Sequence, residues 1–149
     1  MDVLAILKQK SRPVYTVTIN QTVDDAINLM AAKNVRALIV TDKGQPVSIF
    51  AERDVFRCYV RDRKCAFSDI KLKRAMTRRL FSAETTDEIP DLITMMIQSD
   101  LEHLPVIADN EIIGVLALID LIEYQIESFT KEIRQLEDYI DDLHEAGRD

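Results

Sequence analysis

The hydrophobic positions of the chain follow two periods, one typical of strands and one typical of helices. Short apolar runs rich in β-branched residues predict strands at residues 14–17, 37–41 and 47–51. Between and after them, apolar residues at helical spacing predict a helix from about residue 23 to Asn34 and another from Glu52 to about Asp62. A short apolar stretch before Pro13 predicts an opening helix.

This strand–helix–strand–strand–helix order returns 66 residues later. Residues 14–60 align with residues 80–126 without a gap, and the apolar pattern matches throughout. The second copy predicts strands at 80–83, 104–108 and 112–117, with helices at 88–100 and from 118 onward. A repeat this short cannot bury its hydrophobic face alone, so the two copies should pack together. The predicted fold class is α+β, with two β-α-β-β-α repeats related by a pseudo-two-fold axis.

The pattern also divides the chain. We assign the first repeat, with the opening helix, to residues 1–60 and a linker helix to residues 61–79, with a helical turn at 70–75. The second repeat covers residues 80–125, and a C-terminal helix covers residues 119–145.

The C-terminal helix carries apolar residues in alternating steps of four and three. Isoleucine at position a with mainly leucine at position d favours a parallel two-stranded coiled coil, so we expect a homodimer. The same stripe could instead dock on the globular part of the chain. The a positions are Ile126, Ile133 and Ile140, and the d positions are Ile122, Phe129, Leu136 and Leu143.

Composition and charge narrow the function. The 149 residues are 47% hydrophobic and carry a net charge of −7, which indicates a folded domain and makes nucleic acid an unlikely partner. Basic residues cluster between Arg57 and Arg79, either as a solvated linker face or as a cleft rim that meets phosphates. No apolar run is long enough to span a membrane and no signal peptide is visible, so we expect no membrane partner and a cytoplasmic protein.

Cys58 and Cys65 show no metal-ligand spacing, so neither a disulfide framework nor a metal site is expected. Cys58 is interpreted as a small core residue. His103 has no nucleophile beside it in a recognisable pattern, and nothing else supplies a catalytic set. An enzyme is therefore not expected, and His103 alone is most simply a structural residue.

Three motifs at fixed separations carry a family resemblance: Ser-Ile-Phe-Ala-Glu-Arg-Asp at 48–54, Met76-Thr77, and His-Leu-Pro-Val at 103–106. Together with the repeat they resemble a tandem pair of CBS domains, or Bateman module, over residues 10–125. The resemblance implies two clefts that bind adenosine-containing regulatory ligands: AMP, ADP, ATP, S-adenosylmethionine or NAD. It implies a sensor with no required cofactor, commonly a dimer.

The family motif ends in Thr or Ser, two variable residues and an aspartate that binds the ribose hydroxyls. Here the aspartates are Asp54 and Asp120, while both hydroxyl positions are alanine, Ala51 and Ala117. The first cleft should keep ribose and charge recognition, and the second should be weaker. Alternatively, both aspartates only cap their helices. The ligand-binding residues that the resemblance implies are Thr16, Val35, Ala37, Arg53, Asp54, Met76, Thr77, Ser82, Leu101, His103 and Asp120.

Two functions fit these observations. The first is a regulatory module that binds an adenosine-type small molecule between the repeats and signals to an unknown protein target through its dimer and C-terminal helix. The second is a ligand-free dimeric interaction scaffold whose nucleotide sites have degenerated.

Overall fold

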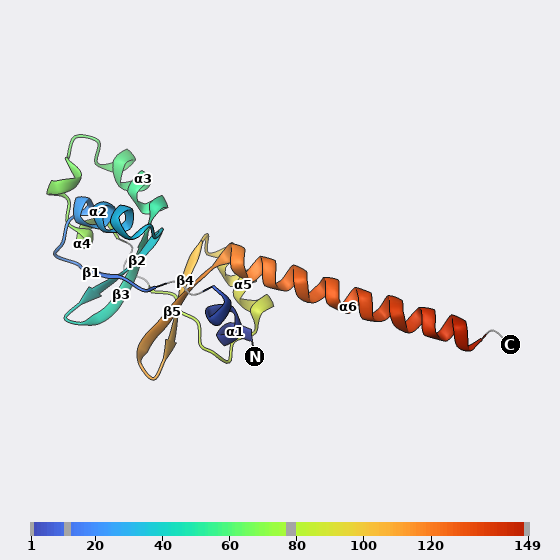
Figure 1. Cartoon of the computed structure of the whole chain (residues 1–149). Coiled ribbons are helices and arrows are strands. Elements are labelled where there is room, and N and C mark those ends of the chain that lie inside the picture. Colours follow the sequence, from blue (N-terminus) through green and yellow to red (C-terminus); the bar gives the residue numbers. More distant parts are fainter. Residues whose placement is uncertain (1, 11–12, 77–79, 148–149) are drawn as a thin grey trace.

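The computed structural model describes residues 2–10, 13–76 and 80–147. Its element order confirms the predicted repeat, and Figure 1 shows the two repeats side by side with a long helix leaving them. The first half contains α1 (Asp2–Gln9), β1 (Thr16–Thr18), α2 (Val23–Lys33), β2 (Ala37–Asp42), β3 (Gln45–Ala51) and α3 (Glu52–Arg61). The second half contains α5 (Ile89–Gln98), β4 (His103–Ala108), β5 (Glu111–Ala117) and α6 (Leu118–Ala146).

The segment between the repeats holds two short helical pieces. These are a 3-10 turn, η1 (Phe67–Asp69), and the one-turn helix α4 (Leu72–Ala75). The helical turn expected at residues 70–75 is thus present, and between the end of α3 and residue 76 the structure shows these two short pieces.

The two sheets differ at their first strand. In the first repeat, β1 runs parallel to β2, which pairs with β3 in antiparallel fashion. In the second repeat, β4 and β5 form the sheet, and the strand expected at residues 80–83 is reduced to a single bridge from Ala83 to Val106. The cause is Pro105. It takes the place of Ile39, whose N–H bonds to the Tyr15 carbonyl at 3.0 Å, and proline has no N–H to donate.

The backbone keeps the 66-residue spacing in detail. Each hairpin turns through two residues with positive φ, as a type I′ turn requires, and each carries a register shift at the matching position. A third left-handed residue follows the first helix of each repeat and stops it. The left-handed pairs are Asn34 and Asp100, Lys43 and Asp109, and Gly44 and Asn110.

The hydrophobic cores are crossed between the repeats. Val3 and Ile6 of α1 lie in the core of the second repeat, together with Leu104 and Leu116. Ile70 and Leu72, which precede the second repeat, lie in the core of the first. The helix that the sequence groups with residues 1–60 therefore packs on the other repeat, and Figure 1 shows α1 beside β5 and α6.

The contact between α1 and β5 is close. A Cβ on Gly114 would lie 2.6 Å from the Leu7 side chain, so the glycine leaves room for the helix. The equivalent position in the first repeat, Ser48, is a buried polar residue.

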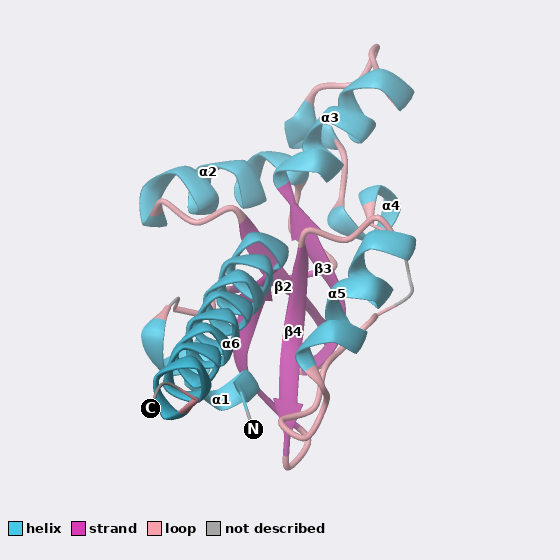
Figure 2. Cartoon of the chain, turned by 90° about the vertical axis from the view of Figure 1, so that its right-hand side faces the viewer, coloured by secondary structure: helices cyan, strands magenta, loops and turns pink. Residues whose placement is uncertain are grey.

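The C-terminal helix α6 extends away from the repeats (Figure 1). Every residue from 129 to 147 is exposed, so the apolar stripe does not dock on the globular part. Figure 2 looks along this helix and shows it beside the strands, with α2, α3 and α5 around the sheets. No helix in the described part of the chain is long and apolar enough to cross a membrane.

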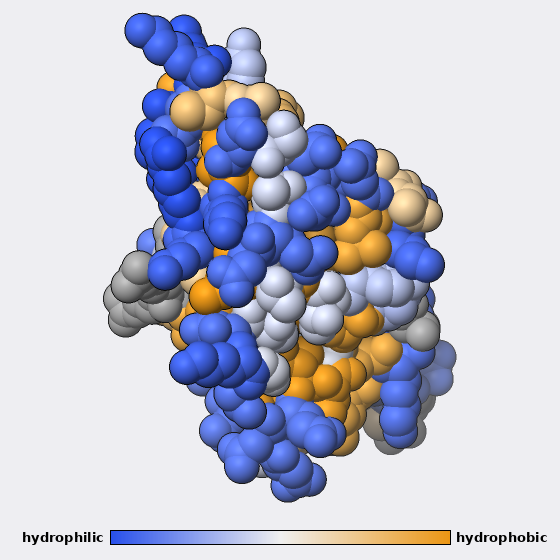
Figure 3. Space-filling model, turned by 90° about the vertical axis from the view of Figure 1, so that its left-hand side faces the viewer, coloured by the Kyte–Doolittle hydropathy of each residue, from blue (hydrophilic) through white to orange (hydrophobic). Residues whose placement is uncertain are grey.

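The face of the molecule opposite to the one that Figure 2 shows is mainly hydrophilic. Figure 3 shows charged and polar side chains over most of it, with hydrophobic atoms visible between them. Larger exposed apolar side chains lie on α3, where Phe56, Tyr59 and Val60 are each more than half exposed.

Because α1 packs in the core of the second repeat, a core substitution in α1 should destabilise the second repeat more than the first. Ile6→Ala should lower the free energy of unfolding by about 2–5 kcal/mol and speed amide exchange mainly in β4 and β5, although Ile6 lies in the N-terminal helix. The matched variant Leu72→Ala should speed exchange mainly in β2 and β3. Hydrogen exchange read by mass spectrometry checks both, and faster exchange in β2 and β3 of Ile6→Ala would contradict the crossed arrangement.

Candidate ligand-binding clefts

A cavity of about 430 Å³ lies between the two repeats. The first repeat contributes the end of β3 and the start of α3, and the second contributes Phe81 and the segment from α5 to β4. Its volume is in the range of small-molecule sites. The residues that line it are Ile49, Ala51, Arg53, Asp54, Arg57, Phe81, Ser99, Asp100, Leu101, Glu102 and His103.

Asp54 occupies the first turn of α3, where strand β3 becomes helix. Its Oδ2 accepts the Ala51 N–H at 2.8 Å, which satisfies one of the unpaired donors of the helix start. The side chain also faces the cavity and is 17% exposed. The carboxylate of Asp54 therefore both caps α3 and lines the cavity.

Burial raises the pKa of the Asp54 carboxyl above its ordinary value. The hydrogen bond from Ala51 and the positive charges of Arg57 and Arg53 act in the opposite direction and do not outweigh it. Burial thus disfavours the ionised form of Asp54, and a partner that hydrogen-bonds to its oxygens would stabilise that form.

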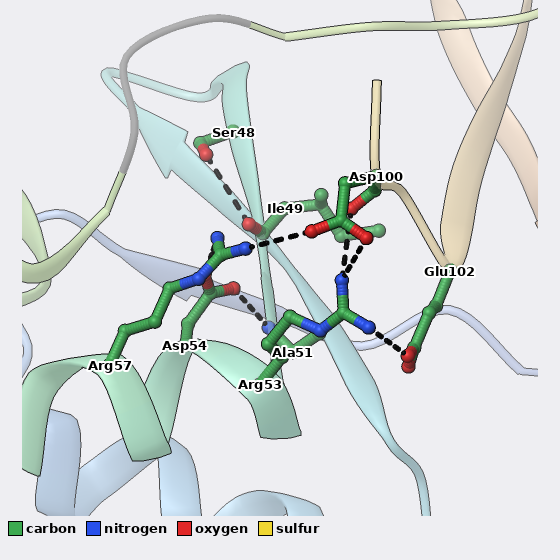
Figure 4. A network of polar contacts seen from close by, with 8 residues as sticks. All are labelled: Ser48, Ile49, Ala51, Arg53, Asp54, Arg57, Asp100 and Glu102. Atoms are coloured by element: carbon green, nitrogen blue, oxygen red, sulfur yellow. Dashed lines mark hydrogen bonds and ion pairs between the residues drawn. The ribbon is translucent and has the colours of Figure 1, made fainter. Parts of the chain in front are cut away.

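Two arginines of α3 connect the repeats. The Arg53 guanidinium pairs with Asp100 and with Glu102, the latter at 2.7 Å. Arg57 lies 3.4 Å from Asp100 and 3.7 Å from Asp54. The bond to Asp100 is the main cause that raises the pKa of Arg53 further. Figure 4 shows the two guanidinium groups pointing toward Asp100 from α3.

The same segment joins the cavity to the C-terminal helix. The backbone carbonyl of Glu102 accepts the N–H of Leu118, the first residue of α6, at 2.9 Å. His103 is paired with Ala117 across β4 and β5. A change in the position of Glu102 therefore acts directly on the start of α6.

A second cavity, of about 510 Å³, lies on the other side of His103. Asp120 does not line it: its side chain is buried, with 5% of the residue exposed. The lining is Pro13, Val14, Tyr15, Lys33, Asn34, Val35, Arg36, Ala37, Ile39, His103 and Val115. This cavity offers cations and aromatic surface, without the carboxylate that the first cavity presents.

Comparison with known sequences shows to which protein family the chain belongs. The CBS domain pattern matches residues 6–61 and again residues 68–127, which together make up most of the chain. The chain belongs to the CBS domain family.

Its relatives share the pair of repeats. The CBS domain-containing protein YhcV of Bacillus subtilis is 29% identical over 118 residues, which cover 77% of this chain and 81% of that protein. The solved structure of a protein with CBS domains from Burkholderia ambifaria is 33% identical, covers 84% of this chain and 93% of its own, and superimposes with a TM-score of 0.76.

A more distant structure shares the fold. It is a CBS domain protein of Pyrobaculum aerophilum in complex with AMP, 20% identical, with a TM-score of 0.63 over 73% of this chain and 83% of its own.

The structure gathers some of the predicted site residues of this CBS pair and separates others. Arg53, Asp54, Leu101 and His103 line the first cavity. Val35 and Ala37 line the second, again with His103.

Other predicted site residues lie elsewhere. Thr16 and Ser82 are exposed and line neither cavity, although their neighbours Tyr15 and Phe81 do. Met76 lines a third cavity beside Lys73, on the far side of the first repeat's strands. Thr77 lies outside the described residues.

Three charged residues of the first cavity were not predicted as ligand-binding residues: Arg57, Asp100 and Glu102. Arg57 was visible only as one of the clustered basic residues. Asp100 occupies the left-handed position equivalent to Asn34, which identifies a turn and says nothing of its ion pair. Among the described residues, no group of three or more metal-ligating side chains is placed to hold an ion.

The raised pKa of Asp54 predicts a pH-dependent effect of Asp54→Asn. The amide oxygen can still accept the Ala51 N–H, and the variant carries no buried charge. Below the ordinary aspartate pKa of about 3.9, wild-type Asp54 is protonated in both states and imposes no penalty; above its folded pKa the penalty is complete. The Tm of Asp54→Asn relative to wild type should therefore be higher at about pH 7 than at about pH 3.5.

The matched control is Glu52→Gln, at an exposed carboxylate in the same helical turn. Its Tm difference from wild type should change less over the same pH range. A relative Tm of Asp54→Asn that falls from acid to neutral pH would contradict the assignment.

Proposed function

We propose that this CBS pair is a regulatory module that binds an adenosine-containing ligand in the first cavity. The observation that carries the proposal is that Asp54 and Arg53 of one repeat face Leu101 and His103 of the other across one cavity. A carboxylate that accepts two ribose hydroxyls makes charge-assisted hydrogen bonds, which are stronger than neutral ones. The AMP complex of the Pyrobaculum aerophilum protein, which has the same fold, supports this class of ligand.

In this proposal, Arg53 and Arg57 bind the phosphate of the ligand. Ala51 has no hydroxyl, and losing one such hydrogen bond costs about 1 kcal/mol. Arg53 and Arg57 are charged donors at the same end of the cavity, already engaged by Asp100 and Glu102. A ligand phosphate would compete with these carboxylates for the guanidinium groups.

That competition gives a route for the signal. When a phosphate takes Arg53, Glu102 loses its side-chain partner while its carbonyl still holds the first N–H of α6. Ligand binding would thus shift the equilibrium position of the segment that carries α6. The proposed output is a change in the orientation of α6, read by a protein target.

The ligand proposal predicts a thermal shift. Among AMP, ADP, ATP, S-adenosylmethionine and NAD, at least one compound at a hundredfold excess over its Kd should stabilise the protein by about 2.7 kcal/mol. Asp54→Ala should lose this shift because the ribose contact is gone, and Glu52→Ala, on the exposed side of the same turn, should keep it. If none of the five compounds raises the Tm of wild type, the ligand-free scaffold becomes the better account.

The scaffold remains the second candidate because a specific observation favours it. Alanine replaces the hydroxyl residue in both repeats, at positions 51 and 117, and the described ion pairs already fill the charged end of the first cavity. Both functions share the homodimer, which we assign to the exposed apolar stripe of α6.

The homodimer predicts the effect of polar substitutions in that stripe. Ile133→Asn together with Ile140→Asn should convert a dimer to a monomer in sedimentation velocity, because both side chains are half exposed in the single chain and would be buried in a dimer. Gln135→Asn with Asp142→Asn, on the outer flank of the same helix, should leave the dimer intact. A dimer that survives the isoleucine substitutions would place the contact elsewhere.

A further inference from the structure

The exposed stripe of α6 raises the question of which direction its partner runs. Six apolar layers at positions a and d, from Ile126 to Leu143, are each about half exposed or more. The residue types at a and d predict two parallel strands, but the charges at the flanking e and g positions also act on the orientation and oppose that prediction here.

A parallel pair would bring like charges together at those flanks. Glu132 is a g residue and Glu137 is the e residue that faces it from the second copy, so two Glu–Glu contacts would form in each dimer. The helix contains nine acidic and two basic residues, and the stretch from 137 to 145 has five acids and no Lys or Arg. In a parallel pair these two acidic ends would lie side by side.

An antiparallel pair removes these contacts. When Ile133 packs against Leu136 of the second copy, residues whose numbers add up to 269 lie level with one another. At the flanks of an antiparallel pair, g faces g and e faces e, each offset by two residues from the level position. Glu132 then faces Tyr139 of the second copy, Thr130 faces its Glu137, and Glu123 faces its His144. Glu137 of the second copy, although level with Glu132, lies on the opposite flank. No flanking pair in this register joins two acids.

The distribution of charge supports the same direction. Lys131 and Arg134, the two basic residues of α6, lie level with residues 138 and 135 of the second copy, where its acidic end begins. The root of the helix adds Lys8 and Lys10 of α1, and Lys10 already pairs with Glu123 at 3.4 Å. The acidic stretch 137–145 of one copy lies level with residues 124–132 of the other, which carry two acids and one lysine, so the two acidic ends are kept apart. The two helix dipoles also oppose each other favourably.

The length of the helix fits this register. Ile122, the first d residue of α6, lies level with Gly147, where α6 ends. The whole projecting helix is thus used. We propose that α6 pairs with α6 of a second copy in antiparallel orientation, with Ile126 opposite Leu143, so that the two CBS pairs lie at opposite ends of the rod. This inference rests on the proposed homodimer and not on the ligand.

Disulfide mapping of the full chain tests the orientation. Cys65 is exposed and is first replaced (Cys65→Ser), whereas Cys58 is buried. Ile126→Cys and Leu143→Cys are then made in separate chains. In the antiparallel register the two 126 positions are about 25 Å apart, far beyond disulfide reach, whereas 126 and 143 are in contact. Mild oxidation should link the chains only when both variants are mixed.

A charge variant gives an independent readout. Glu137→Lys would face Glu132 in a parallel pair, so it should raise the yield of self-linked Ile126→Cys dimers. Glu127→Lys, at an outward position with the same change of charge, should not.

Each outcome is decisive. Self-linking of Ile126→Cys without the lysine substitution would overturn the antiparallel orientation while the homodimer stands. A protein without the cysteine variants that sediments as a monomer would overturn the homodimer itself, and the thermal-shift result would still decide the ligand.

Discussion

The rest of the structure depends on the exchange of apolar segments between the two repeats. Each repeat has a small sheet and two helices, and segments from outside the repeat complete its core. These segments supply Val3 and Ile6 in one repeat and Ile70 and Leu72 in the other. Because each filling segment comes from the chain before the opposite repeat, the connections between the cores cross from one repeat to the other twice. The cavities between the repeats inherit this geometry.

Within that geometry, the charged side chains at the junction of β3 and α3 each serve more than one interaction. The carboxylate of Asp54 completes the helix start through the Ala51 N–H and also faces the cavity, where burial disfavours its charge. Arg53 and Arg57 face the same space and are held by acids of the other repeat. Ion pairs therefore join the two repeats across this cavity, and exposed pairs of this kind are individually weak.

Much of the fold could be predicted from sequence because its local signals agree. Thr22 and Asp25 form a capping box at the start of α2, and Asn34 stops α2 in the left-handed conformation that asparagine tolerates. The 66-residue spacing then carried each element from one repeat to the other, since turns and core positions recur with it. The prediction was wrong at residues 80–83, where Pro105 removes a donor that Ile39 supplies in the first repeat.

The site was predictable only in part, for a physical reason. Arg53, Asp54, Leu101 and His103 lie in motifs that fix backbone positions, and those positions meet in the first cavity. The reach of a long side chain across the interface follows from packing, not from a motif, so the pairing of Arg53 with Asp100 left no trace in the sequence. Nor could hydrophobic periodicity tell which core α1 would join, because Val3 and Ile6 have the right spacing for either.

The exchange of segments also sets the order in which the protein can fold as it is made. The first repeat can close its core as soon as residues 70–72 have been synthesised. Helix α1 precedes both repeats along the chain, but it has no core to enter until the strands and helices of residues 89–121 have followed. During translation α1 is thus an exposed amphipathic segment until the second repeat has been made and packs on it.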